Sequence, residues 1–280
     1  MGKSTVNHDS LKKSATSALR FDLTALVRGL NNAIGFFLLA ALWEAAPRLG
    51  LINASFFPPL SVVLVELVGL LVTQEFWDYF LSTLRTWALG LVLATAAGVL
   101  AGLAIGLLPG ARKYTHSTIE FLRPIPSVSL IPAVILIFGS RYQSGVILIV
   151  YAAFWQVLLQ MLYGLNDIDA VARDTARSFR FSRLGFIRHL AWPTLLPFLF
   201  TGVRLAASIA LVLAVTAEMV IGTFGIGRGI VIAQNSNASA LVYALVIVTG
   251  LMGVAINVAA REIEKRVLRW HPSVRNADAL

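Results

Sequence analysis

Residues 166–197 have the sequence NDIDAVARDTARSFRFSRLGFIRHLAWPTLLP, a charged segment between two apolar runs that are each long enough to cross a bilayer. We term this segment the island. Five arginines lie in it: Arg173, Arg177, Arg180, Arg183 and Arg188. Because Lys and Arg accumulate in the cytoplasmic loops of membrane proteins, we expect the island on the cytoplasmic side of a membrane.

The island also contains the start and stop signals of folded structure. Asp167 or Asp169 can cap a helix that begins at Ile168. Ser182 can cap a second helix, which ends before Pro193 because proline interrupts the hydrogen bonds of a helix interior. The pattern predicts two short amphipathic helices outside the membrane. The alternative for a segment of this length is a solvated connector.

The composition indicates an integral membrane protein. Hydrophobic residues make up 58% of the chain and charged residues 13%, with a mean hydropathy of +0.78, whereas a soluble chain has about 25% charged residues. The net charge of +9 could suggest a nucleic-acid partner, but most of the basic residues lie in segments that flank apolar runs. Membrane topology explains the positions of these basic residues. We therefore expect the lipid bilayer, and no nucleic acid, as a partner of the chain.

The chemistry-bearing residues exclude several classes of function. The segment Gly2-Lys3-Ser4 has no upstream glycine or strand, so it does not form a phosphate-binding loop, and the chain is not expected to hydrolyse ATP. The four histidines are scattered without metal-ligand spacing, and there is no cysteine. We therefore expect no catalytic residue, metal site or cofactor bound by this chain.

The apolar runs predict an all-α protein with six spans. The spans are expected at residues 31–47, 84–108, 118–138, 145–165, 195–217 and 240–259, within a membrane domain of residues 29–260. Residues 1–28 form an N-terminal tail with an interfacial helix, and residues 261–280 form a C-terminal tail. A helix over residues 62–72, capped by Ser61, is expected outside the membrane against the bundle. The positive charges place both termini in the cytoplasm.

The second span carries small residues at every fourth position. These are Gly90, Ala94, Gly98, Gly102 and Gly106. Small residues at this spacing let a neighbouring helix approach closely in lipid. The pattern predicts a helix-packing seam rather than a binding site.

The third span is interrupted by Pro124, Pro126 and Pro132. Prolines free backbone carbonyls, which a membrane tolerates only where protein or a cavity covers them, so this helix is expected to face the bundle interior. Glu120 and Arg123 are three residues apart and can form an ion pair. Two roles stay open for the pair: anchoring the helix at the interface, or gating.

Two charged residues stand in the fifth span or at its end. Arg204 lies in the middle of it and needs an inward route or an acceptor in the bundle. Glu218 lies at the outer end, where ordinary interfacial solvation and a role in the transport path are both open.

The island resembles the signature loop of permease subunits of ABC importers, in which Glu-Ala-Ala is followed by Gly and later by a hydrophobic-Pro pair. Asp174-Thr175-Ala176 stands at Glu-Ala-Ala, and Trp192-Pro193 with Leu196-Pro197 closes the motif. The family Gly falls on Arg180, where a left-handed backbone would cost about 1 to 2 kcal/mol. The resemblance implies that the loop of residues 166–193 docks into a groove on a partner ATPase. The residues that it implicates are Ala172, Asp174, Thr175, Ala176, Arg177, Ser178, Arg180, Ser182 and Pro193.

Three further runs resemble the permeases of the nitrate, sulfonate, taurine and bicarbonate importers: LWEAAPRLGLINASFFPPLSVVL at 42–64, EFLRPIPSVSLIPAVILIFG at 120–139 and TAEMVIGTFGIG at 216–227. This resemblance implies a type I ABC importer (MetI-like) fold in the bacterial inner membrane. It also implies a second permease subunit, a cytoplasmic ATPase dimer that holds ATP and Mg²⁺, and an external solute-binding protein. The candidate path or gating residues are Glu120, Arg123, Pro124, Pro126, Arg204 and Glu218.

The solute implied by the resemblance is a small anion such as a sulfonate, taurine, nitrate or bicarbonate. Another small solute, such as a thiamine precursor or an aromatic carboxylate, is an alternative within the same class. A secondary transporter is the alternative outside it. That class should show interrupted helices at corresponding positions of two halves, whereas only the third span is interrupted here.

Overall fold

The computed structural model describes residues 34–108 and 110–269, and these residues form helices joined by short loops. The chain divides into two compact units, residues 1–65 and residues 66–280. The first unit contains a helix over residues 34–48 and the start of α2 (Leu60–Leu71). The predicted interfacial helix of residues 1–28 and the end of the C-terminal tail lie outside the described residues.

In the first unit, Glu44 caps the start of α2, a role that the sequence predicted for Ser61. The helix α2 begins at Leu60, one residue before the predicted cap. The backbone amide of Ser61 donates to Glu44 Oε2 at 2.8 Å, and its hydroxyl donates to Glu44 Oε1 at 2.9 Å. Because the first amides of a helix lack partners within it, an acceptor from an earlier helix satisfies one of them.

The second unit opens with a single long helix, α3 (Gln74–Leu107), which at 1.5 Å per residue is about 50 Å long. Its start is ten residues before the predicted one, because Thr73 caps it: the Thr73 side chain accepts from the Phe76 amide at 3.4 Å. The helix ends before Gly110, which has a left-handed backbone with a φ of 79°.

The predicted third span is not one helix. It divides into α4 (Ala111–Leu122), a 3₁₀ turn η1 (Ser127–Leu130) and α5 (Ile131–Phe138), with a bend of 81°. Pro124 and Pro126 supply no amide donors, and α4 ends at Leu122, just before them. Pro132 lies in the first turn of α5, where no donor is needed. The Tyr151 hydroxyl donates to the Leu122 carbonyl at 2.7 Å and so covers one carbonyl at the break. The span faces the bundle on one side: Ile131 and Val134 of α5 are buried, whereas α4 has no buried residue and packs Ile119 and Leu122 against α6.

The other long helices of the second unit are α6 (Tyr142–Asn166), α9 (Trp192–Ile221) and α11 (Ser239–Val267), and a shorter helix, α10 (Ile226–Asn235), lies between the last two. The helix α10 lies in the predicted outer loop and was not expected. In the described residues four helices are long and apolar enough to cross a membrane, or five if the bent pair α4 and α5 counts as one span. The prediction of six spans is therefore not confirmed, and the first of them, residues 31–47, begins outside the described part of the chain.

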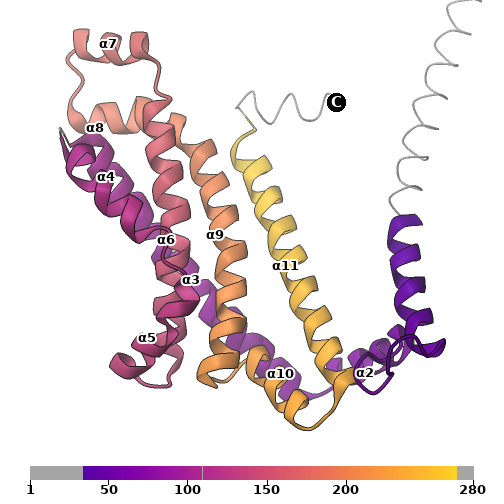
Figure 1. The fold of residues 1–280 in the computed structure, drawn as a ribbon. Helices are drawn as coiled ribbons and strands as arrows, with labels where there is room; N and C mark the ends of the chain where they lie inside the picture. Colours follow the sequence, from indigo (N-terminus) through magenta and orange to yellow (C-terminus); the bar gives the residue numbers. More distant parts are fainter. Residues whose placement is uncertain (1–33, 109, 270–280) are drawn as a thin grey trace, which may run out of the picture. The chain divides into compact units, whose positions relative to one another are not determined.

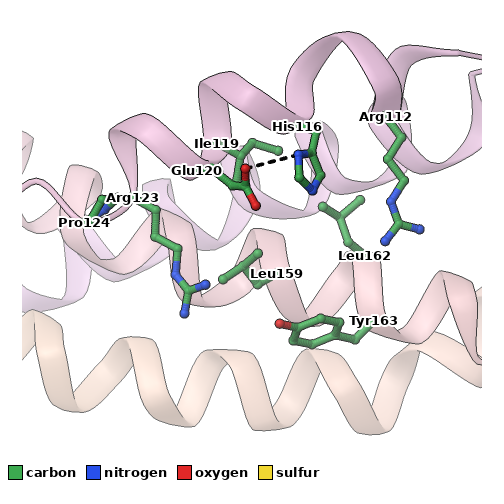
Figure 2. A pocket seen from close by; sticks show the side chains of 9 residues that line it. All are labelled: Arg112, His116, Ile119, Glu120, Arg123, Pro124, Leu159, Leu162 and Tyr163. Carbon is green, nitrogen blue, oxygen red and sulfur yellow. Dashed lines mark ion pairs between the residues drawn. The ribbon is translucent and has the colours of Figure 1, made fainter.

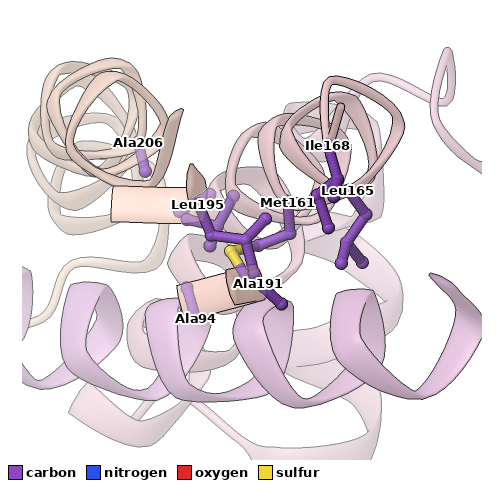
Figure 3. Close-up of a cluster of buried hydrophobic side chains, with 9 residues drawn as sticks. Ala94, Met161, Leu165, Ile168, Ala191, Leu195 and Ala206 are labelled. Carbon is purple, nitrogen blue, oxygen red and sulfur yellow. The ribbon is translucent and has the colours of Figure 1, made fainter. Parts of the chain in front are cut away.

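The predicted glycine seam is confirmed, and its partner is α6. A Cβ added at Gly98 would lie 2.7 Å from Val157 Cβ, and one added at Gly102 would lie 2.5 Å from Met161 Cβ, which is closer than real Cβ atoms come. Figure 3 shows the adjoining apolar cluster, to which Ala94 of α3, Met161 of α6 and Leu195 of α9 belong. The core of the second unit is thus the contact of α3, α6 and α9.

Candidate functional site

The island contains a short separate helix, α7 (Ala170–Ser178), which lies at the opposite end of the bundle from α10 (Figure 1). Asp169 caps it, and its Oδ1 accepts from the Ala172 amide at 2.8 Å. Of the two capping alternatives in the sequence, Asp169 is the one that the structure uses. The helix therefore begins two residues later than expected.

The turn after α7 requires a left-handed residue, and Arg180 supplies it with a φ of 51°. The backbone closes over this turn because the Arg180 amide donates to the Arg177 carbonyl at 2.9 Å and the Phe181 amide donates to the Ala176 carbonyl at 3.0 Å. These are the bonds of a helix C-terminus that usually ends in glycine. The position at which the family glycine was aligned is thus left-handed in this chain, although arginine occupies it.

The second helix of the island, α8 (Arg183–Phe186), begins as predicted, with the Ser182 Oγ accepting from the Gly185 amide at 3.1 Å. The prediction that it ends before Pro193 is wrong. It continues through a π turn (Ile187–Ala191) into α9, so residues 183–221 form one continuous helix. The wider π turn precedes Pro193 and accommodates the missing donor. The second helix of the island is therefore the first part of a long, mostly apolar helix that ends at Ile221.

The outer face of α7 is exposed and mixed in character. The side chains of Asp174 and Arg177 are 73% and 78% exposed, and they form an ion pair of 3.7 Å. Three large apolar side chains of the island are exposed as well and were not predicted as site residues: Val171 of α7, Phe179 at its end and Leu184 of α8. In the sequence they are recognisable only as three large apolar residues within a charged segment. An apolar patch of this kind marks an interaction surface.

The inner face of α7 joins the island to the bundle. Ala176 is buried, and the Arg173 Nη2 donates to the Leu165 carbonyl at 3.3 Å. Asn166, the last residue of α6, accepts from Arg112 Nη1 through its Oδ1. Ala176 thus faces the bundle, whereas Asp174, Thr175, Arg177 and Ser178 are exposed.

A cavity of about 590 Å³ opens between α4 and α6 (Figure 2). Its lining residues are Arg112, His116, Ile119, Glu120, Arg123, Pro124, Leu159, Leu162 and Tyr163. The predicted ion pair of Glu120 with Arg123 is wrong, because Glu120 Oε2 lies 3.3 Å from His116 Nδ1. His116 is one helical turn before Glu120 on the same face, while Arg123 is at the end of α4, where the chain turns away.

Glu218 is only 2% exposed, so interfacial solvation is the wrong alternative for it. Its Oε2 accepts from Thr83 Oγ1 at 2.9 Å and from the Gly227 amide at 3.0 Å. Thr83 Oγ1 in turn accepts from the Ile226 amide at 2.9 Å. The first amides of α10 are therefore satisfied by side chains of α9 and α3, which explains why a helix forms at this point.

Arg204 has the acceptor that its position demanded. Its Nη1 lies 3.2 Å from Glu264 Oε2, which joins α9 to α11. A charge in an apolar helix is expected to pair in this way.

The six candidate path residues do not form one site. Glu120, Arg123 and Pro124 line the same cavity, and Pro126 follows at the start of η1 without lining it. Arg204 and Glu218 lie on α9 in separate contacts, one with α11 and one with α3 and α10.

Several apolar helices long enough to cross a membrane, together with a charged helical segment at one end of the bundle, define an integral membrane subunit. The model of the family described as "Binding-protein-dependent transport system inner membrane component" matches residues 94–269, which is more than half of the chain. The chain belongs to this family. It is a permease subunit of an ABC importer and not an enzyme.

Individual relatives agree with the family. The chain is 28% identical over 256 residues to the taurine transport system permease protein TauC of Escherichia coli (strain K12), covering 89% of this chain and 93% of that protein. It is 26% identical over 266 residues to the nitrate import permease protein NrtB of Leptolyngbya laminosa, covering 86% and 88%. It is 26% identical over 195 residues to the bicarbonate transport system permease protein CmpB of Synechococcus elongatus, covering 69% and 70%.

The fold has a counterpart among solved structures. A chain of the MetNI methionine ABC transporter in an inward-facing conformation superposes with a TM-score of 0.55 at 17% identity, covering 68% of this chain and 93% of that one. This similarity establishes the MetI-type permease fold alone. As a binding-protein-dependent importer subunit, the chain works with an ATPase and a solute-binding protein.

Proposed function

We propose that the chain forms the path for a small anion across the bacterial inner membrane and couples it to a cytoplasmic ATPase through the island. The observation that carries the coupling is the exposed outer face of α7, on a segment whose second helix continues into α9. Support for an anion comes from the relatives, whose names specify taurine, nitrate and bicarbonate. A thiamine precursor or an aromatic carboxylate is not favoured by these relatives.

The proposed docking surface comprises the exposed members of the predicted set together with the apolar side chains around them. Its members are Asp174, Thr175, Arg177, Ser178, Arg180 and Ser182, with Val171, Phe179 and Leu184 added. The other three predicted members are not part of the exposed surface, because Ala176 is buried and Ala172 and Pro193 are partly buried. Exposed apolar side chains next to charged ones suit a groove that provides both kinds of contact.

The proposed assembly has two permease subunits, either two copies of this chain or this chain and a sibling. It also has an ATPase dimer that holds ATP and Mg²⁺, and a solute-binding protein on the outer side. This chain contributes no cofactor site. The island, both termini and the tails of residues 1–28 and 261–280 lie in the cytoplasm, which is the arrangement that the distribution of Lys and Arg favours.

In the proposed mechanism, closure of the ATPase dimer displaces α7. The displacement passes to α9 because residues 183–221 are one helix. It passes to α6 through the hydrogen bond from Arg173 of α7 to the Leu165 carbonyl. Inward- and outward-facing states then exchange population, since ATP and the loaded binding protein each bind one state more tightly.

The test is recovery of an ATPase with the tagged chain from native membranes in mild detergent, comparing the unchanged chain with Asp174→Ala/Arg177→Ala. A matched control is Gln74→Ala/Asp78→Ala, which removes an exposed polar pair of one helix, joined at 3.1 Å, at the start of α3. We expect a partner with a complete phosphate-binding loop to be recovered with the unchanged chain and the control and to be lost with the island variant. Equal recovery with all three chains would refute the island as the coupling surface.

A further inference from the structure

Two arginines, Arg112 and Arg123, line the cavity between α4 and α6, and neither forms an ion pair with another residue of the described part of the chain. Glu120 is paired with His116, and Arg112 donates to Asn166. Among residues 34–108 and 110–269, no hydrogen bond or ion pair involves the side chain of Arg123. An unpaired guanidinium that lines a cavity is available to a ligand.

The position of Arg123 separates it from the arginines that mark an interface. Arg112 lies beside the last residue of α6, whereas Arg123 follows eleven residues later, about 16 Å further along α4 at 1.5 Å per residue. It stands at the break before Pro124, where the chain leaves the helix. This break lies within the candidate span formed by α4 and α5, and ionisable groups within spans are costly and are found where they serve function.

The surroundings of Arg123 suit an anion that carries an apolar body. Figure 2 shows the side chains of Arg123 and Arg112 extending from α4 toward α6, with Leu159 and the ring of Tyr163 facing them. The Tyr163 hydroxyl is a second donor, since it forms no hydrogen bond with another residue of the described part of the chain. A guanidinium binds two oxygens of one carboxylate, sulfonate or phosphate at once.

The rest of the lining is apolar and gives no donor. Ile119, Leu159, Leu162 and the ring of Pro124 form it. The volume of about 590 Å³ lies in the range of pockets for small organic ligands and far exceeds the space that a bare nitrate or bicarbonate needs. The lining therefore matches an oxyanion head at Arg123 with an aliphatic body against the leucines.

We propose that this cavity is a binding station for the transported solute, with Arg123 as the anion-binding residue, and that the solute is an organic oxyanion of the sulfonate or carboxylate type. The proposal rests on the proposed function and extends it, because it places recognition of the solute's charge in the permease itself. The phosphate of an inner-leaflet lipid has the same chemistry, and it is the competing occupant that the experiment must separate.

The experiment uses the purified permease–ATPase complex in nanodiscs of zwitterionic lipid, without binding protein, and measures binding of ethanesulfonate, butyrate and nitrate. Arg123→Gln is compared with Arg123→Lys and with the control Arg141→Gln, which removes an exposed arginine at the start of α6. We expect Arg123→Gln to weaken binding of the preferred organic anion about tenfold or more, since a charged hydrogen bond is lost. Arg123→Lys should retain part of the affinity, and the control should retain all of it.

Three results would overturn the proposal. In the first, the organic anions bind equally well to the unchanged complex and to Arg123→Gln. In the second, nitrate binds more tightly than either organic anion, and in the third, loss of copurified anionic lipid is the sole effect of Arg123→Gln. ATP hydrolysis stimulated by the loaded binding protein is measured on the same variants. If the complex assembles and hydrolyses ATP normally but Arg123→Gln binds the organic anions as tightly as the unchanged complex, the binding site at Arg123 is refuted and the proposed function stands. If no ATPase copurifies with the unchanged chain, the proposed function is refuted instead.

Discussion

Glu218 is the buried residue on which three helices depend. Its carboxylate and the Thr83 hydroxyl together satisfy the Ile226 and Gly227 amides at the start of α10. Removing the hydroxyl leaves one buried amide without a partner and takes one donor from the carboxylate. A buried polar group without its partner costs about 1 to 3 kcal/mol.

We therefore predict that Thr83→Val lowers the thermal midpoint of the purified protein clearly more than Thr216→Val does. Thr216 is the matched control, because its exposed hydroxyl bonds only to the Val212 carbonyl of its own helix. The measurement is thermal unfolding in detergent by loss of monodisperse protein. Equal midpoints for the two variants would show that the Thr83 hydroxyl does not hold α10 in place.

At the residue scale, the sequence indicated which side chains require a partner, but it did not identify the partner. It indicated that Arg204 must find an acceptor, but Glu264 lies 60 residues away in the chain and could not be chosen from local spacing. Glu120 and Arg123 had the spacing of an ion pair, yet the helix ends at Leu122 and His116 is on the correct face. The left-handed position of Arg180 was anticipated only through the family glycine aligned there.

Among the elements, the α3–α6 seam gives the sharpest contrast between two glycines. A Cβ at Gly98 would collide with Val157 of α6, whereas one at Gly250 of α11 would have no atom within 4 Å. Gly to Ala stabilises an open helix position by about 0.5 to 1 kcal/mol, and overpacking a close contact costs about 1 to 3 kcal/mol. We predict that Gly98→Ala lowers the thermal midpoint and that Gly250→Ala leaves it unchanged or raises it. Gly98→Ala with a midpoint as high as that of Gly250→Ala would contradict the close seam.

Local signals fixed some elements and failed for others. Small residues four apart predicted the seam of α3, and proline at three positions predicted an interruption of the third span, though not a bend of 81°. The helix α10 was missed because its first amides are satisfied by Glu218 and Thr83, from other helices. The end predicted before Pro193 was wrong because a π turn absorbs the proline.

For the whole molecule, the class of protein followed from two kinds of information. Composition and charge distribution predicted a membrane protein, and the runs around Asp174, Arg123 and Glu218 carried the resemblance to importer permeases that the family match confirms. The cavity between α4 and α6 could not be foreseen, because it depends on where α4 ends and how it lies against α6. The Arg123 side chain was named from the sequence, but its neighbours Leu159, Leu162 and Tyr163 were not.

The coupling role of the island is the central claim, and crosslinking from α7 tests it most directly. The chain has no cysteine, so Thr175→Cys and Asn235→Cys each introduce a single site for a thiol-directed photoreactive probe, one on the exposed face of α7 and one at the end of α10. In native membranes, illumination should join the Thr175→Cys chain to a cytoplasmic ATPase, and the Asn235→Cys chain should give no such product. An ATPase joined at Asn235→Cys and not at Thr175→Cys, or joined at neither while the complex stays intact, would contradict the claim.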